Sequence, residues 1–224
     1  MNKRIYSGSI LKSLAFLLLL MGGVIPVNAH TINYDLEKAP FGNVLSYYLK
    51  LGIHHIVPSG LDHILFITGL CLLSNKVKPI IWQATAFTVA HCITLFLSMK
   101  NIIMAPAAIV EPIIALTILF VALENIFFTK LSAWRIGIVF MFGLIHGMGF
   151  ASALNEIGLP RNHFIASLLS FNAGVEIGQL LIILLAFGLF IIPFGNKSWY
   201  RSRVVIPVSI GIACVALYWA IQRF

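Results

Sequence analysis

The chain has 224 residues, of which 60% are hydrophobic and 10% are charged. An average soluble domain is about 45–50% apolar and about 25% charged, so this composition excludes a water-soluble globule. The 15 Lys and Arg outnumber the 7 Asp and Glu and give a net charge of +8. The three cysteines are far apart and form no C-x-x-C pair, which excludes a disulfide scaffold and a zinc ribbon.

The first 29 residues have the pattern of a cleavable secretory signal peptide. Three basic residues precede the apolar run 14–21, and Val27 and Ala29 are small residues at the positions that a signal peptidase reads. The run is shorter than the ~20 residues that a membrane span needs, which argues against an uncleaved anchor. Cleavage after Ala29 makes His30 the first residue, with an α-amine and an imidazole that can chelate one metal ion.

Beyond a short polar stretch, six hydrophobic segments follow. Most have the ~17–25 residues that a helix needs to cross a bilayer, and helices satisfy their own backbone hydrogen bonds in lipid. The sequence therefore predicts an all-α integral membrane protein, with residues 30–224 forming one bundle of about six transmembrane helices. The predicted spans are residues 58–74, 79–98, 105–128, 133–153, 163–194 and 204–221.

The basic residues between the spans predict the orientation of the bundle. A cleaved signal peptide leaves the mature N-terminus outside, and six spans then place the C-terminus outside as well. Seven basic residues fall inside and five outside, the direction that the positive-inside rule requires. We therefore expect a bacterial inner-membrane protein with both termini periplasmic, whose positive charge sets topology and needs no nucleic-acid partner. The inside set is Lys76, Lys78, Lys130, Arg135, Lys197, Arg201 and Arg203, and the outside set is Lys38, Lys50, Lys100, Arg161 and Arg223.

Several polar side chains lie within the predicted spans. An ionisable group at the centre of a bilayer costs roughly 2.5–3.5 kcal/mol on insertion scales, so these groups must face one another, water or an ion. A rise of about 1.5 Å per residue puts groups from five helices at one level in the outer half of the bundle. Convergence at one depth predicts a cation site. The groups are Asp62, His63, His91, Glu111, His146 and Asn172, with Glu176 nearer the middle.

The fifth span has two faces. Asn172, Glu176 and Gln179 are spaced i, i+4, i+7 and share one face, whereas Gly174 and Gly178 lie opposite and predict close helix packing. One face therefore presents ligands and the other packs against a neighbour.

Three other features leave alternatives open. Pro58 fits the first turn of the first span, which puts His54 and His55 in the external mouth and leaves Asp62 to bind a cation or to orient His63. Glu124 lies near the inner end, where Arg135 or Lys130 can neutralise it. The glycines at 143, 147 and 149 indicate either tight packing or a locally broken helix beside His146.

The donor types favour a divalent transition metal. Imidazole and carboxylate suit nickel, cobalt, zinc or iron, whereas copper(I) prefers sulfur ligands and calcium or magnesium prefers more oxygen. The predicted ligands are His63, His91 and His146, with Asp62, Glu111 and Glu176 as further ligands or charge-compensating groups. The predicted supporting or pathway residues are Asn172, Gln179, His55, Glu124 and His30.

Six segments in one order resemble the HupE/UreJ family of hydrogenase and urease accessory membrane proteins. They are residues 60–66, 85–91, 110–112, 122–125, 142–151 and 170–179. The resemblance covers nearly the whole mature chain and implies a nickel or cobalt permease with a signal peptide. The family motif H-P-x-x-G-x-D-H maps its last two residues onto Asp62 and His63, but His55 lies one residue farther from Asp62 than the motif requires, and Pro58 does not follow it directly.

Three functions fit these residues. The first is a permease that takes up a divalent metal ion by alternating access, and Phe-x-x-x-His in both the second and fourth spans hints at a repeat. The second is an intramembrane metal-dependent hydrolase, since three histidines with an open position are typical of catalytic zinc. The third is a metal-binding accessory subunit that transports nothing. Metalloenzyme-maturation proteins or further copies of the chain are the expected partners besides the metal ion and the lipid bilayer.

Overall fold

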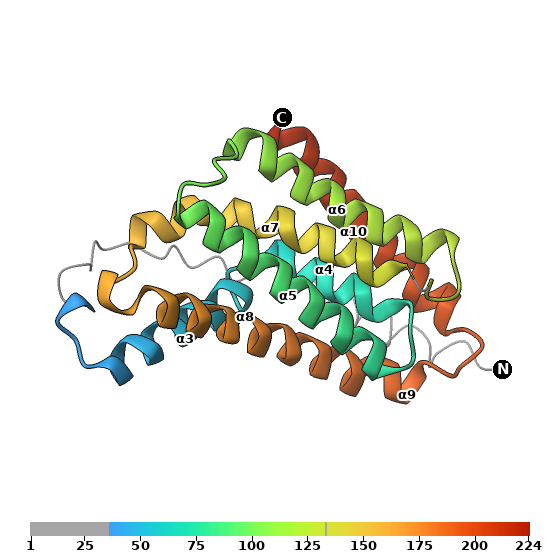
Figure 1. Cartoon of the computed structure of the whole chain (residues 1–224). Helices are drawn as coiled ribbons and strands as arrows, with labels where there is room; N and C mark the ends of the chain where they lie inside the picture. The colour runs from blue at the N-terminus through green and yellow to red at the C-terminus, as the bar shows by residue number, and fades with distance from the viewer. Residues whose placement is uncertain (1–35, 133) are drawn as a thin grey trace.

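The computed structural model describes residues 36–132 and 134–224, and within these ranges the chain is helical and contains no strand (Figure 1). The predicted signal peptide, its cleavage after Ala29 and His30 lie outside the described residues.

Five helical segments are long and apolar enough to cross a membrane. A segment of 23 residues is about 34 Å long, against a hydrocarbon core of about 30 Å. The chain is therefore a multi-pass helical membrane protein, and these segments lie close to five of the six predicted spans. They are α5 (Val77–Met99), α6 (Ala107–Phe127), α7 (Arg135–Ile157), the 34-residue segment Arg161–Phe194 with α8 (Phe164–Ala186) and α9 (Ile192–Phe194), and Arg201–Arg223 with α10 (Ile206–Arg223).

The first span differs from the prediction. Residues 58–74 do not form one helix. Instead α3 (Phe41–Ile56) and α4 (Leu61–Leu72) are separated by four residues and bent by 67°, and only together do they have the length and composition of a span. Pro58 lies in this break and not in the first turn of a helix. By itself α4 has 12 residues and is about 18 Å long, too short to cross the hydrocarbon core.

The break lies deep in the bundle because α3 runs alongside α8. Ser170 Oγ donates a hydrogen bond to the Leu45 carbonyl oxygen (2.7 Å), and a Cβ added at Gly178 would lie 2.7 Å from Cβ of Ile56. Gly178 is near the middle of the segment Arg161–Phe194. The glycine face predicted on the fifth span therefore packs against α3, and it places the end of α3 at mid-bundle.

Glycines also bring α7 against α5. A Cβ added at Gly143 would lie 2.9 Å from Cα of Phe87, and one added at Gly147 would lie 2.9 Å from Cα of His91, with the carbonyl oxygens of both α5 residues closer still. Since α7 is continuous from Arg135 to Ile157, these glycines serve tight packing and do not mark a broken helix. The backbone around His91 is thus held directly by α7.

We expect Gly147→Ala to loosen this contact. The added methyl group meets backbone atoms of α5, which cannot rotate away, so the two helices must separate, at a cost of about 1–3 kcal/mol. The thermal unfolding temperature of the purified protein in detergent should fall. Gly137→Ala is the matched control, because a Cβ at Gly137 on the same helix meets nothing within 4 Å. Equal unfolding temperatures for the two variants would contradict the packing argument.

The loops between α4 and α5, between α6 and α7, and after α9 gather at one end of the bundle, on the right in Figure 1. These loops and the adjacent helix ends carry all seven residues predicted to lie inside, and we call this end the basic end. Just within it, Arg135 Nε lies 2.9 Å from Glu124 Oε2, and the two side chains are only 2% and 5% exposed. Of the two partners expected for Glu124, Arg135 and Lys130, Arg135 is therefore the one that neutralises it.

Candidate metal centre

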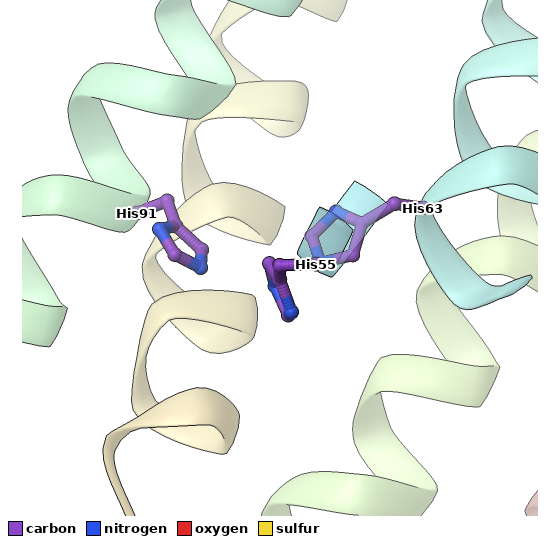
Figure 2. Close-up of side chains that lie close together, drawn as sticks. All are labelled: His55, His63 and His91. Carbon is purple, nitrogen blue, oxygen red and sulfur yellow. The ribbon is translucent and has the colours of Figure 1, made fainter. Parts of the chain in front are cut away.

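Three histidines from three helices meet at the break. His55 lies in the last turn of α3, His63 in the first turn of α4 and His91 in α5, and their rings converge (Figure 2). One potential ligand atom of each lies within 4.8 Å of the others. A tetrahedral ion with metal–nitrogen bonds of about 2.0–2.1 Å needs its nitrogens about 3.3 Å apart. Small side-chain movements therefore suffice to close the three imidazoles on one ion.

A hydrogen bond to Asn172 sets which nitrogen of His91 faces the cluster. Asn172 Nδ2 donates to the Leu168 carbonyl oxygen (2.9 Å), so its Oδ1 is the atom that lies 3.1 Å from His91 Nδ1 and accepts a hydrogen bond from the Nδ1–H group. His91 Nε2 is then unprotonated, and it is buried without a hydrogen-bond partner. This is the state that a metal ligand requires, and Asn172 supplies the orienting contact.

His146 lies at the edge of the same cluster. Its ring centroid is 5.2 Å from that of His63, although it does not belong to the compact group of three. Thr117 Oγ1 donates to the Ile114 carbonyl oxygen (2.7 Å) and therefore accepts from His146 Nε2 at 3.0 Å. Nδ1 of His146 is thereby left as the unprotonated nitrogen, available as a fourth donor.

Aromatic rings close the cluster on the side toward the basic end. One helical turn in that direction, Phe66 follows His63 on α4, Phe87 precedes His91 on α5, and Phe142 precedes His146 on α7. Phe66 and Phe87 are fully buried. The ring of Phe66 is 5.0 Å from that of Phe87 and 6.2 Å from that of Phe142. The two Phe-x-x-x-His segments thus contribute to one layer, which separates the histidines from the half of the bundle nearer the basic end.

On the other side a cavity of about 490 Å³ leads to the cluster, and we call it the vestibule. The vestibule is lined by His55, His63, His146 and Glu111. Asp62 is at the vestibule too, and it forms a two-pronged ion pair in which Arg223 Nη1 and Nη2 donate to its oxygens at 3.0 and 3.2 Å. The carboxylate of Asp62 therefore already has a cationic partner from the end of α10.

Three other predicted residues lie away from the histidines. Glu176 accepts hydrogen bonds from two threonines of α5, one turn nearer the basic end than Asn172. Gln179 is a further turn along α8 and fully buried. Glu124 belongs to the ion pair with Arg135. In the described part of the chain none of these three forms a hydrogen bond or an ion pair with a cluster histidine, whereas Asn172 does.

Two residues of the site, His55 and Thr117, were weakly or not at all indicated by the sequence. Placing the start of the first span at Pro58 put His55 in the external mouth, but the break turns it inward, with its ring centroid 4.8 Å from that of His63. The only indication of His55 in the sequence was its place near the first histidine of the family motif H-P-x-x-G-x-D-H. Thr117 is an ordinary apolar-helix residue by pattern, and only its contact with His146 distinguishes it.

These features define a multi-pass helical membrane protein with a buried histidine cluster that is reached from one side. The sequence model of the family described as HupE / UreJ protein matches residues 32–223, so the chain belongs to the HupE/UreJ family. No curated protein and no solved structure matches it. The family relates the chain to metal-associated membrane proteins, in keeping with a cluster that can hold a metal ion.

Proposed function

We propose that this protein is a permease for a divalent transition metal ion, with nickel or cobalt as its substrate. The observation that carries the proposal is the cluster of His55, His63 and His91, whose ligand atoms lie within 4.8 Å of one another inside a membrane bundle. Uncharged imidazoles suit borderline divalent ions better than hard ones. Membership of the HupE/UreJ family supports the same class of substrate.

The metal ion reaches the cluster through the vestibule. Glu111 and Asp62 attract a hydrated cation there, and the cation competes with Arg223 for the Asp62 carboxylate. The histidines then replace part of its hydration shell, with His146 as a fourth nitrogen donor. The excess of basic residues at the opposite end supports a cytoplasmic position for that end, and hence a vestibule open to the periplasm in the bacterial inner membrane.

Release toward the basic end requires the layer of Phe66, Phe87 and Phe142 to open. The bent pair α3 and α4 is suited to this movement, because broken helices in transporters place their ends at the substrate site. His55 and His63 flank the break, so a change in the bend separates two ligands and weakens the site. The ion leaves for cytoplasmic proteins that mature a metalloenzyme.

Uptake into proteoliposomes tests this function. The wild-type protein should carry nickel or cobalt into vesicles that enclose a metal-sensitive dye, and His63→Ala should abolish the flux, since it removes a ligand at the break. His163→Ala is the control, because His163 lies at the start of α8 against Phe41 and outside the cluster. Tight metal binding without flux in the wild type would refute transport and favour an accessory subunit or a metal-dependent hydrolase.

A further inference from the structure

A second polar group, partly buried, lies between α5 and α8, and it is made of oxygen donors. Thr85 Oγ1 donates to Glu176 Oε1 at 2.6 Å, and Thr88 Oγ1 donates to Glu176 Oε2 at 2.5 Å. Gln179 follows Glu176 by three residues on α8 and therefore shares its face. We call these four residues the oxygen cluster.

The oxygen cluster holds one negative charge without a positive partner. Two short hydrogen bonds from hydroxyl groups reach the carboxylate of Glu176, but they bring no positive charge. Among the described residues no Lys, Arg or His forms an ion pair with it, whereas Glu124 and Asp62 each have an arginine. An uncompensated carboxylate within a membrane bundle is costly, and such groups are typical of ion pathways.

The buried amide of Gln179 is an independent indication of a binding site. Its side chain is fully buried, yet neither its amide nitrogen nor its amide oxygen has a hydrogen-bond partner. A buried amide that has no partner at either of its polar atoms is unfavourable, and binding of a cation satisfies its oxygen. The amide oxygen of Gln179, the two threonine hydroxyls and the carboxylate of Glu176 together offer five oxygen atoms.

We propose that the oxygen cluster binds a sodium ion. Oxygen donors suit hard cations, and the single carboxylate balances one positive charge, which favours a monovalent ion over calcium or magnesium. The hydroxyl hydrogens rotate away as the ion arrives, and the lone pairs of Thr85 and Thr88 take their place. The cluster contains no imidazole or sulfur, so the substrate metal of the histidine site is a poor fit to it.

The two sites share both helices. Thr88 precedes His91 by three residues on α5, and Glu176 follows Asn172 by four residues on α8, which are axial distances of about 4.5 and 6 Å. Sodium at the oxygen cluster therefore fixes the spacing of α5 and α8 beside the contact between His91 and Asn172. Resting on the proposed function, this makes sodium the coupling ion for metal transport.

Binding of ²²Na⁺ to the purified protein, measured by scintillation proximity, tests the sodium site directly. The wild type should bind ²²Na⁺ that unlabelled sodium displaces, and Glu176→Gln should weaken binding at least tenfold, because it removes the only charge at nearly constant shape. Thr88→Val should weaken it as well. Glu156→Gln is the matched control, since Glu156 is exposed and lies at the end of α7 that is away from the basic end. Size-exclusion chromatography and circular dichroism establish that each variant is folded.

The outcomes separate the sodium site from the metal permease. Absence of ²²Na⁺ binding in the wild type, or equal binding in Glu176→Gln, overturns the sodium site. Folded Glu176→Gln should still bind nickel at the histidines in sodium-free buffer, as measured by isothermal titration calorimetry. A wild type that binds sodium but no divalent metal overturns the permease and leaves the sodium site standing. Metal uptake that follows a proton gradient and ignores sodium overturns the coupling role.

Discussion

His91→Ala should weaken nickel or cobalt binding by at least about 100-fold, which corresponds to about 2.7 kcal/mol. His91 is fully buried, its Nε2 faces the cluster without a partner, and α7 and Asn172 hold it on two sides. No exposed side chain can replace it at that position. Isothermal titration calorimetry on the folded variant, supported by elemental analysis after metal loading, measures the loss.

Asn172→Leu provides a graded comparison. Removing the acceptor for His91 Nδ1 leaves all three cluster imidazoles present but no longer fixes which nitrogen carries the proton, and loss of such an outer contact typically weakens metal binding by about 10–100-fold. His163→Ala should bind metal like the wild type. If His91→Ala bound as tightly as His163→Ala, the cluster would not be the metal site. In that case the histidines would serve only helix packing.

Arg135→Met should destabilise the protein by about 3–5 kcal/mol, because it leaves the Glu124 carboxylate buried without its positive partner. Thermal or denaturant unfolding in detergent measures this effect. Arg161→Met is the matched control, since Arg161 is exposed and its removal leaves no buried carboxylate without a partner. The change lies at the basic end, so metal affinity at the histidines of the folded variant should stay close to the wild-type value.

The double variant Glu124→Gln with Arg135→Met gives the sign of the coupling between the two residues. Removing both charges abolishes the unpaired carboxylate, and the double variant should be more stable than Arg135→Met alone. A double variant that is less stable than either single change would mean that the two side chains act through separate contacts. The ion pair would then not be the reason for the loss.

Hydrophobic runs in the sequence predicted five spans to within a few residues, since the length of an apolar helix is a local property set by the bilayer. The same runs gave the wrong start for the first span. Apolar composition cannot distinguish one helix from two half-helices, because the bend between α3 and α4 depends on packing against α8. That single feature accounts for the misplacement of His55.

The residue types and their helical spacing by themselves determined a membrane bundle, the glycine face of the fifth span and the HupE/UreJ family. They left Arg135 and Lys130 as alternative partners of Glu124, and the tertiary structure selects Arg135. Only the tertiary structure decided which polar groups meet. It places His55 beside His63 and His91, and it pairs Asp62 with Arg223. It also lets Glu176 accept hydrogen bonds from Thr85 and Thr88, about one helical turn from the histidines. The physical reason is that spacing fixes the face on which a side chain lies, whereas its contacts depend on helix rotation, tilt and breaks, which packing between distant segments sets.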